Sequence, residues 1–472
     1  KKPIVYYIDP ATPKKLRKYI KQGVDDWQKV FETAGFKNAI YAKMPPTKEE
    51  DPEFSMEDIR YSSIRYVAST TRNATGPSVS DPRTGEIIES DIIWYHNHLR
   101  SYRNRYLLET GAANPSARTL DTKPEEIGEM MRMVIAHEVG HALGLPHNMA
   151  ASFAYPVDSL RSGKFTQKYG IAATIMDYAR YNYIAQPGDK NIRFIRQLGP
   201  YDHYAINWGY RRIPKAKQPK DEVKTLDKWI SEKANDPKYR FGGKRFDPSS
   251  QTEGIGNDQV MASTYGIKNL KIVAKNLPEW TSDQTNNYED LSELYGELLS
   301  VWNRYVGHVA GNIGGVYEFN KKPEQKGNVY ETVAKNRQIA SLNWLLKNTF
   351  DTQRWLLDKN ILNKIDETGY SDRILKYQNR HLYSLLNVKT LKRMIDAEVI
   401  ETEFYAVSDM IKTLRKGVFS EAKKTQNVDL FRRNLQKSFI DRMGVLMNDS
   451  DTKNTDITSI VRGELVTLKY II

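Results

Sequence analysis

Cysteine is absent from all 472 residues of the chain. This absence excludes a disulfide framework, a thiolate zinc site, an iron–sulfur cluster and a catalytic thiol. It does not fix the compartment, because many exported proteins also lack cysteine. A chain of this length can bury a large core without such cross-links, and its length predicts two or three domains.

Long apolar runs are also missing. No stretch of about 18 apolar residues occurs, so we expect no transmembrane helix. The chain begins KKPIVYYIDP, without an initiator methionine or a visible signal peptide. We interpret the chain as trimmed, so the missing signal says nothing about export.

The charge is one-sided but dispersed. The formal net charge is +13, from 71 basic and 58 acidic residues. Such an excess would suit an anionic partner. However, the basic residues lie among acids, and only short clusters such as Lys215–Lys220 stand out. We therefore expect a solvated surface and no nucleic-acid partner. Gly-rich phosphate loops and a Gly-x-Ser-x-Gly motif are absent as well, which leaves nucleotide-dependent and serine-hydrolase functions without support.

Strands and helices alternate in the first part of the chain. Hydrophobic periodicity and turn residues predict extended segments at 3–8, 39–44, 62–69 and 76–96, and helices at 13–35, 124–144 and 199–212. This order predicts an α/β (α+β) domain with a mixed sheet. We place it at residues 1–212.

The second part of the chain has a different character. Residues 213–221 are rich in proline and lysine, and 240–258 resemble a loop, so we expect a connecting region over 213–281. After Tyr288, apolar residues recur every three or four positions: Leu291, Leu294, Leu298, Trp302, Tyr305 and Val309. This stripe predicts a mainly α-helical domain over residues 282–472.

The stretch HEVGHALGLPH holds three of the eight histidines, at offsets 0, 4 and 10. Residues four apart share a helix face, so His137 and His141 can reach one metal ion. Gly144 can adopt positive φ and end the helix, which lets His147 return as a third ligand. Three histidines leave a fourth position open on Zn²⁺, as in catalytic zinc sites. Glu138 would then lie beside the ion, as a general base for the attacking water.

The alternatives to a catalytic zinc site are a chance match to the motif and a helix that binds no zinc. His-Glu-x-x-His alone would occur in roughly one chain of this length in twenty, whereas adding the glycine and third histidine lowers this to about one in several thousand. An ordinary helix with surface histidines, or a relic that kept its ligands without zinc, stays open.

Met176 and Tyr178 lie downstream in AATIMDYARYNY. The histidine motif followed by such a methionine resembles the metzincin clan of zinc metalloendopeptidases. The resemblance implies that Met176 lies in a tight turn beneath the three imidazoles. It also implies that Tyr178, two residues later, hydrogen-bonds the developing oxyanion. The expected cofactor is one catalytic Zn²⁺, and the expected activity is peptide-bond hydrolysis.

Four further stretches sharpen this resemblance: HEVGHALGLPHNMAAS, IMDYARYNYIAQPGD, LGPYDHYAINWGY and GIGNDQVMASTYGIKNLK. Together they resemble large secreted or surface-exposed zinc metalloproteases of gut-type bacteria, in which a helical region of unassigned function follows the catalytic domain. The resemblance implies upstream domains and a secreted, periplasmic or outer-surface location in a bacterium. The disulfides of some animal metzincins cannot exist here.

Substrate recognition follows from the same resemblance. Metzincins bind an extended peptide along an antiparallel edge strand. We expect that strand within Ala74–Ser80, with Gly76, Ser78, Val79 and Ser80 as its candidate residues. The loop from Ala150 to Thr174 would help to form a side-chain pocket.

The remaining histidines favour no second metal site. His96 and His98 are expected to be an exposed pair, His203 to be structural, and His308 and His381 to be isolated on helices. Two non-enzymatic alternatives stay open: a vestigial zinc-site protein that binds surface glycoproteins or polymers, and a surface scaffold that works through its helical half.

Overall fold

The computed structural model describes residues 2–243, 246–282, 287–422 and 427–471. Contacts divide the chain into two compact units. Unit 1 consists of Lys1–Gly243 and Thr252–Asp258, and unit 2 consists of Lys244–Gln251 and Gln259–Ile472. The boundaries at residues 212 and 281 stay predictions.

Unit 1 contains the predicted mixed sheet, which is thereby confirmed. Its strand order is β2-β1-β3-β7-β4. The strands are β1 Ile4–Ile8, β2 Ile40–Lys43, β3 Ser62–Val67, β4 Ala74–Thr75 and β7 Asp91–Tyr95. The pairs among β2, β1, β3 and β7 are parallel, whereas β4 pairs antiparallel with β7 at one edge. A separate hairpin joins β5 Val79–Ser80 to β6 Ile87–Glu89, within the extended segment predicted at 76–96.

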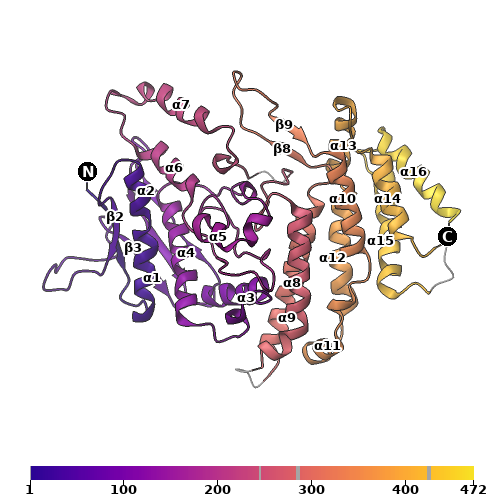
Figure 1. Cartoon of the computed structure of the whole chain (residues 1–472), viewed down its shortest axis with the longest axis horizontal. Coiled ribbons are helices and arrows are strands. Elements are labelled where there is room, and N and C mark those ends of the chain that lie inside the picture. The colour runs from indigo at the N-terminus through magenta and orange to yellow at the C-terminus, as the bar shows by residue number, and fades with distance from the viewer. Residues whose placement is uncertain (1, 244–245, 283–286, 423–426, 472) are drawn as a thin grey trace. The chain divides into compact units, whose positions relative to one another are not determined.

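Helices cover this sheet and form the core with it. Helix α1 (Lys14–Asp25) packs against α4 (Pro124–Ala142) and β2, and Figure 1 shows α1 beside α4. The helix predicted over 13–35 is present as α1 and α2 (Trp27–Thr33), which meet at Asp26, and the carboxylate of Asp26 pairs with Arg132 of α4. The core contains Trp27, Ile64 and Trp94, none of which is exposed.

Helix α3 (His98–Thr110) was not predicted from the sequence. Its residues Tyr106–Thr110 are buried in an unbroken run. A helix buried on several sides lacks the one-sided apolar stripe that sequence periodicity detects. The remaining elements of unit 1 are η1 Pro115–Ala117, η2 Ser152–Ala154, η3 Asp158–Arg161, α5 Gly163–Tyr169, α6 Pro200–Tyr210, η4 Pro219–Asp221, α7 Val223–Lys233 and η5 Pro237–Tyr239.

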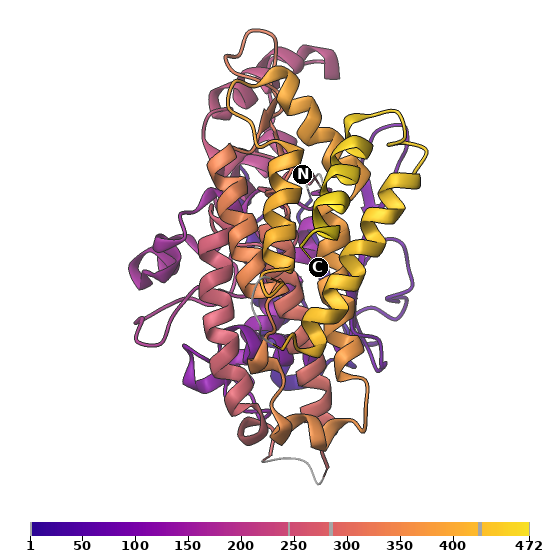
Figure 2. The ribbon, with the colours of Figure 1, turned by 90° about the vertical axis from the view of Figure 1, so that its right-hand side faces the viewer.

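Unit 2 is helical, as the sequence predicts. Its elements are α8 Gln259–Trp280, α9 Glu289–Ala310, β8 Val316–Glu318, β9 Tyr330–Thr332, α10 Lys335–Leu345, η6 Leu346–Phe350, η7 Arg354–Leu356, α11 Lys359–Ile365, α12 Tyr370–Leu385, α13 Val388–Ile400, α14 Val407–Val418, α15 Leu430–Asn448 and α16 Asp456–Lys469. Helices of this unit run side by side in Figure 2. Among them, α8 packs on α9 and α12 packs on α15. All six residues of the predicted stripe are buried in α9.

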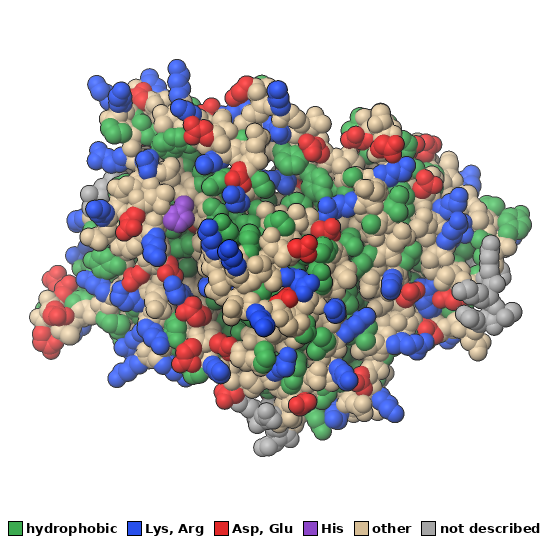
Figure 3. All heavy atoms as spheres, viewed as in Figure 1, with side chains coloured by type: hydrophobic (Ala, Val, Ile, Leu, Met, Phe, Trp, Pro, Cys, Tyr) green, Lys and Arg blue, Asp and Glu red, His purple; other side chains and the backbone are tan. Residues whose placement is uncertain are grey.

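The surface and the helices carry two further observations. On the face in Figure 3, basic side chains are spread among acidic ones and do not gather in one patch. Within the described ranges, no helix is both long enough and apolar enough to span a membrane.

Candidate metal centre

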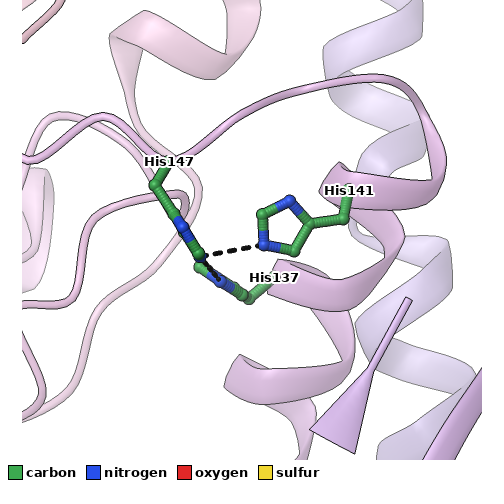
Figure 4. A group of neighbouring side chains, drawn as sticks. All are labelled: His137, His141 and His147. Carbon is green, nitrogen blue, oxygen red and sulfur yellow. Dashed lines mark hydrogen bonds between the residues drawn. The ribbon is translucent and has the colours of Figure 1, made fainter. Parts of the chain in front are cut away.

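The three histidines of HEVGHALGLPH converge on one point. His137 and His141 project from α4, and His147 reaches them from the loop that follows (Figure 4). The His147 Nε2 atom lies 3.2 Å from Nε2 of His137 and 3.0 Å from Nε2 of His141. His137 is 3% exposed, and the other two are partly buried. The structure therefore brings the three predicted ligands together.

The loop that carries His147 begins with a tight helix end. Gly144 has a φ of +90°. Its N–H donates to the His141 carbonyl at 2.9 Å, and the Leu145 N–H donates to the Gly140 carbonyl at 3.0 Å. These two bonds form a Schellman motif, which reverses the chain within two residues. The reversal turns His147 back toward the ligands on α4.

Main-chain carbonyls orient two of the imidazoles. The Nδ1–H of His137 donates to the Ile175 carbonyl at 2.7 Å, and that of His141 donates to the Leu145 carbonyl at 2.9 Å. An imidazole that donates from Nδ1 presents a lone pair on Nε2, which is the form that binds a metal. Burial lowers the pKa of His137 well below its ordinary value and that of His147 to about 4. The ligands are therefore neutral at physiological pH.

This arrangement fits zinc. Lone pairs of neutral imidazoles that face one another at about 3 Å repel, and a cation between them removes that repulsion. Two nitrogens bound to one tetrahedral ion at about 2.0–2.1 Å lie about 3.3 Å apart. The spacings of 3.0 and 3.2 Å are close to that value. Three imidazoles, two of them with carbonyl partners, are a donor set for zinc that leaves one coordination position open.

Glu138 follows the first ligand on α4 and is 7% exposed. Burial raises its pKa to about 7, and the nearby positive charge of Arg196 opposes that shift. Gly76, just beyond β4, packs directly on the main-chain carbonyl of Glu138, where a Cβ atom would overlap that oxygen. The end of the antiparallel edge strand therefore lies against the turn of α4 that carries Glu138.

Met176 forms an apolar floor next to the ligands. Its side chain is fully buried, and its sulfur occupies the space in which a Cβ atom of Gly140 would lie. Gly140 stands between the two histidines of the helix, so Met176 contacts the ligand-bearing turn from below. Trp27 packs on the same position and donates from Nε1 to the Ala136 carbonyl at 3.0 Å.

Two buried aspartates hold the Met176 turn, and the sequence analysis missed both. Asp202 of α6 accepts hydrogen bonds from the Ile175 N–H at 3.0 Å, from the Gly199 N–H at 2.7 Å and from the Thr174 hydroxyl. Asp177 accepts from the Ser152 N–H at 2.8 Å. Burial raises the pKa of each carboxyl to about 6. For Asp202, the signal available in the sequence was its place in the first turn of the helix predicted at 199–212.

Tyr178 lies over the ligands. Its ring centroid is 4.3 Å from that of His147 and 5.6 Å from that of His137. Burial, followed by the nearby Glu138, raises the pKa of its phenol, so the hydroxyl stays protonated at neutral pH. The structure thus places Tyr178 at the metal centre.

A buried ionic cluster follows Tyr178, and sequence reasoning did not find it. The Glu253 carboxylate lies 2.6 Å from Nη2 of Arg105 and 2.7 Å from Nε of Arg180. Glu253 is 6% exposed and has a φ of +60°. It belongs to Thr252–Asp258, a segment that sequence order separates from the rest of unit 1.

The other predicted residues lie elsewhere. Ser78 is an exposed loop residue, and Val79 and Ser80 form β5 of the separate hairpin. The expected exposed pair is wrong in one half: His96 is exposed, whereas His98 is buried at the start of α3 between Trp94 and Tyr102. His203 shares a hydrogen bond of 2.7 Å with the hydroxyl of Thr33, and it does not belong to the group formed by the three ligands.

Comparison with known proteins agrees with this geometry. Residues 119–426 match the sequence model of a protein family described as Met-zincin. The match covers more than half of the chain. No curated protein and no solved structure matches the chain. The matched range contains all three histidines, Met176 and most of the helices of unit 2. The chain therefore belongs to the Met-zincin family of zinc metallopeptidases.

Proposed function

We propose that this protein is a zinc-dependent endopeptidase in which Glu138 is the general base and Tyr178 stabilises the oxyanion. The observation that carries the proposal is the convergence of three Nε2 atoms beside a buried carboxyl group on the same helix turn. When bound, one zinc ion held by His137, His141 and His147 would polarise the scissile carbonyl and acidify the attacking water.

Glu138 has the properties of a general base. Its pKa of about 7 lies near physiological pH, where a carboxylate both accepts a proton readily and returns it. In the proposed mechanism Glu138 takes the proton of the attacking water and delivers it to the leaving amine. Its position directly after a ligand keeps it beside the reacting atoms.

Tyr178 supplies a hydrogen-bond donor. The ring packs on two of the ligands, and its raised pKa keeps the hydroxyl proton in place. We assign its hydroxyl to the oxygen that becomes negative during attack. The contact between Met176 and Gly140 fixes the position of the ligand-bearing turn of α4 relative to that donor.

The proposed substrate is an extended peptide. Strand β4 is an antiparallel edge whose free side can accept main-chain hydrogen bonds, and Gly76 lies against Glu138 at its end. We assign substrate pairing to Gly76, Ser78, Val79 and Ser80, and a side-chain pocket to residues 150–174. The finer proposals of upstream domains and of a secreted, periplasmic or outer-surface location in a bacterium rest on the sequence resemblance.

Replacement of Glu138 by glutamine tests the mechanism. We expect E138Q to retain zinc, measured by metal analysis, and to lose cleavage of casein and of a proteome-derived peptide library. E125Q is the matched control, because Glu125 is exposed in the first turn of the same helix. Cleavage by E138Q at the parent rate would refute the assigned base. Loss of zinc from E138Q would show instead that Glu138 supports the metal.

A further inference from the structure

A cavity of about 280 Å³ lies in unit 1 beside α4. One wall is the face of α4 from Glu129 to Ala136, and the facing wall is the segment 193–198. Its floor reaches Ile175, whose carbonyl accepts the hydrogen bond from His137. The volume is near the lower end of ligand pockets, which begin at about 300 Å³.

Arg196 lines this cavity with an unsatisfied charge. The side chain is 2% exposed. Its Nη1 donates to the Ile175 carbonyl at 3.1 Å, and its Nε has no hydrogen-bond partner among the described residues. Within the same part of the chain, no carboxylate forms an ion pair with it. A buried charge in this state costs free energy unless an opposite charge or further acceptors accompany it.

Arg193 lies on the same wall and is also unpaired. Its Nε donates to the Ile195 carbonyl at 3.1 Å, and no described carboxylate is within ion-pair distance. Burial lowers the pKa of both guanidinium groups, yet an arginine stays charged at neutral pH. Two cationic forks therefore line one cavity without an ion pair among the described residues, although Asp177 acts on Arg196, and Glu129 and Asp26 act on Arg193, at longer range.

The acidic residues of the wall are already engaged. Arg132 binds both carboxylate oxygens of Asp26 at 2.7 Å and lies 3.3 Å from Glu129. Arg132 thus shows how this wall neutralises an arginine when a protein carboxylate is available. Lys29, an exposed residue that also lines the cavity, adds a further positive charge. The cavity therefore has an excess of positive charge.

We propose that this cavity binds a small oxyanion, either a carboxylate or a tetrahedral anion of the phosphate type, between the guanidinium groups of Arg193 and Arg196. Both groups offer several N–H donors in a planar fork, which suits either kind of oxyanion. The anion would supply the partner that Arg196 lacks.

The position of the site connects it to the metal centre. Arg196 and His137 donate to the same carbonyl, that of Ile175. An anion on Arg196 would draw the guanidinium toward the cavity and leave the carbonyl to His137 alone. The anion would also screen the buried positive charge nearest to the metal ligands. The binding step itself requires no catalysis, so failure of the proposed peptidase mechanism would leave it standing.

Titration calorimetry on the full zinc-loaded chain tests the site with two probes. Sulfate represents the tetrahedral anions, and acetate represents the carboxylates. We expect saturable binding of at least one of them with one anion per chain, and we expect R193Q to weaken that binding at least tenfold. The probe that binds more tightly identifies the ligand class. R193Q is preferred to changes at Arg196, because a change at a fully buried residue can prevent folding.

R83Q is the matched control, because it removes the same charge from an exposed arginine paired with Asp81. We expect R83Q to bind the anion as the parent does. No saturable binding of either probe would overturn the proposal. Equal binding by R193Q and the parent would also overturn it, since the anion would then be an adventitious ion only.

Discussion

The sulfur atom of Met176 fills the space beside Gly140 that any larger residue would need. Gly140 lies between His137 and His141, and Met176 lies 35 residues downstream of His141. The contact therefore ties the turn that carries two ligands to the turn that carries Tyr178. It also gives the glycine of HEVGH a physical reason, because a helix interior does not otherwise favour glycine.

The contact between Gly140 and Met176 predicts strong coupling between substitutions. G140A should destabilise the protein by about 1–3 kcal/mol, since an inserted methyl group overpacks a full core. M176A should also destabilise it, by leaving a cavity. In the double variant the two effects should not add, because the smaller side chain makes room for the methyl group. Urea unfolding of the four proteins measures this, and additive effects would contradict the packing.

Gly144 allows a test of conformation without steric interference. Its φ is +90°, and no atom lies within 4 Å of the position that a Cβ atom would take. G144A should therefore cost about 1–2 kcal/mol from the left-handed backbone alone. It should also weaken zinc binding, because His147 depends on this reversal. G144N is the control, since asparagine tolerates this conformation better, and it should recover part of both losses. Zinc competition with a chromogenic chelator and urea unfolding measure the two effects.

The ligand set could be predicted because its geometry is local. His137 and His141 share a helix face by periodicity alone, and Gly144 and Pro146 mark the reversal toward His147. The apolar stripe of α9 was predictable for the same reason, since it depends on spacing within one helix.

The supporting residues could not be predicted, because distant parts of the chain bring them together. Asp202 holds the Met176 turn from α6, and Glu253 reaches Arg105 across 148 positions of sequence. Arg196 looks like an ordinary surface arginine in the sequence, yet it is buried and shares the Ile175 carbonyl with His137. No local period marks such residues, and their role follows only from tertiary packing.

Removal of zinc should destabilise the protein in a way that depends on the three histidines. Binding to the folded state alone adds about 2.7 kcal/mol when free zinc exceeds its Kd by about 100-fold. A chelator should therefore lower the melting temperature, and added zinc should restore it. H141A should melt at one temperature with or without zinc. H96A, at an exposed histidine, should keep the full zinc effect. A zinc effect that survives in H141A would place the ion elsewhere.

The buried carboxyl group of Asp202 should make the free energy of unfolding depend on pH. Its carboxyl is buried, and its pKa is raised from 3.8 to about 6 in the folded protein. The folded state therefore holds this proton more tightly than the unfolded chain does. Its contribution to stability is complete below pH 4 and is lost as the pH rises through 6, by about 2–3 kcal/mol. Relative to D202N, the parent should therefore lose about 2–3 kcal/mol of unfolding free energy as the pH rises from below 4 to above 6.

Urea unfolding of zinc-free protein between pH 4.5 and 7.5 measures this shift, and removal of zinc avoids a contribution from acid release of the metal. D202N provides the reference without a titrating carboxyl at position 202. A shift in favour of the parent at higher pH would show that the folded-state pKa of Asp202 lies below 3.8, so that its three hydrogen bonds outweigh its burial.

Among the substitutions of a charged residue proposed here, removal of the Glu253 charge should lower the free energy of unfolding the most. Its carboxylate pairs with Arg105 and Arg180, and its side chain is 6% exposed. E253Q leaves Arg180 facing a neutral amide, whereas Arg105 keeps its ion pair with Glu109, and the loss of this buried charge should cost about 3–5 kcal/mol. It should also lower the turnover number more than it changes KM, because Arg180 lies two residues after Tyr178. E57Q is the control: Glu57 pairs with Arg65 but its side chain is 81% exposed, so its loss should cost less than about 1 kcal/mol. Similar losses in the two variants would show that the buried cluster adds nothing beyond a surface ion pair.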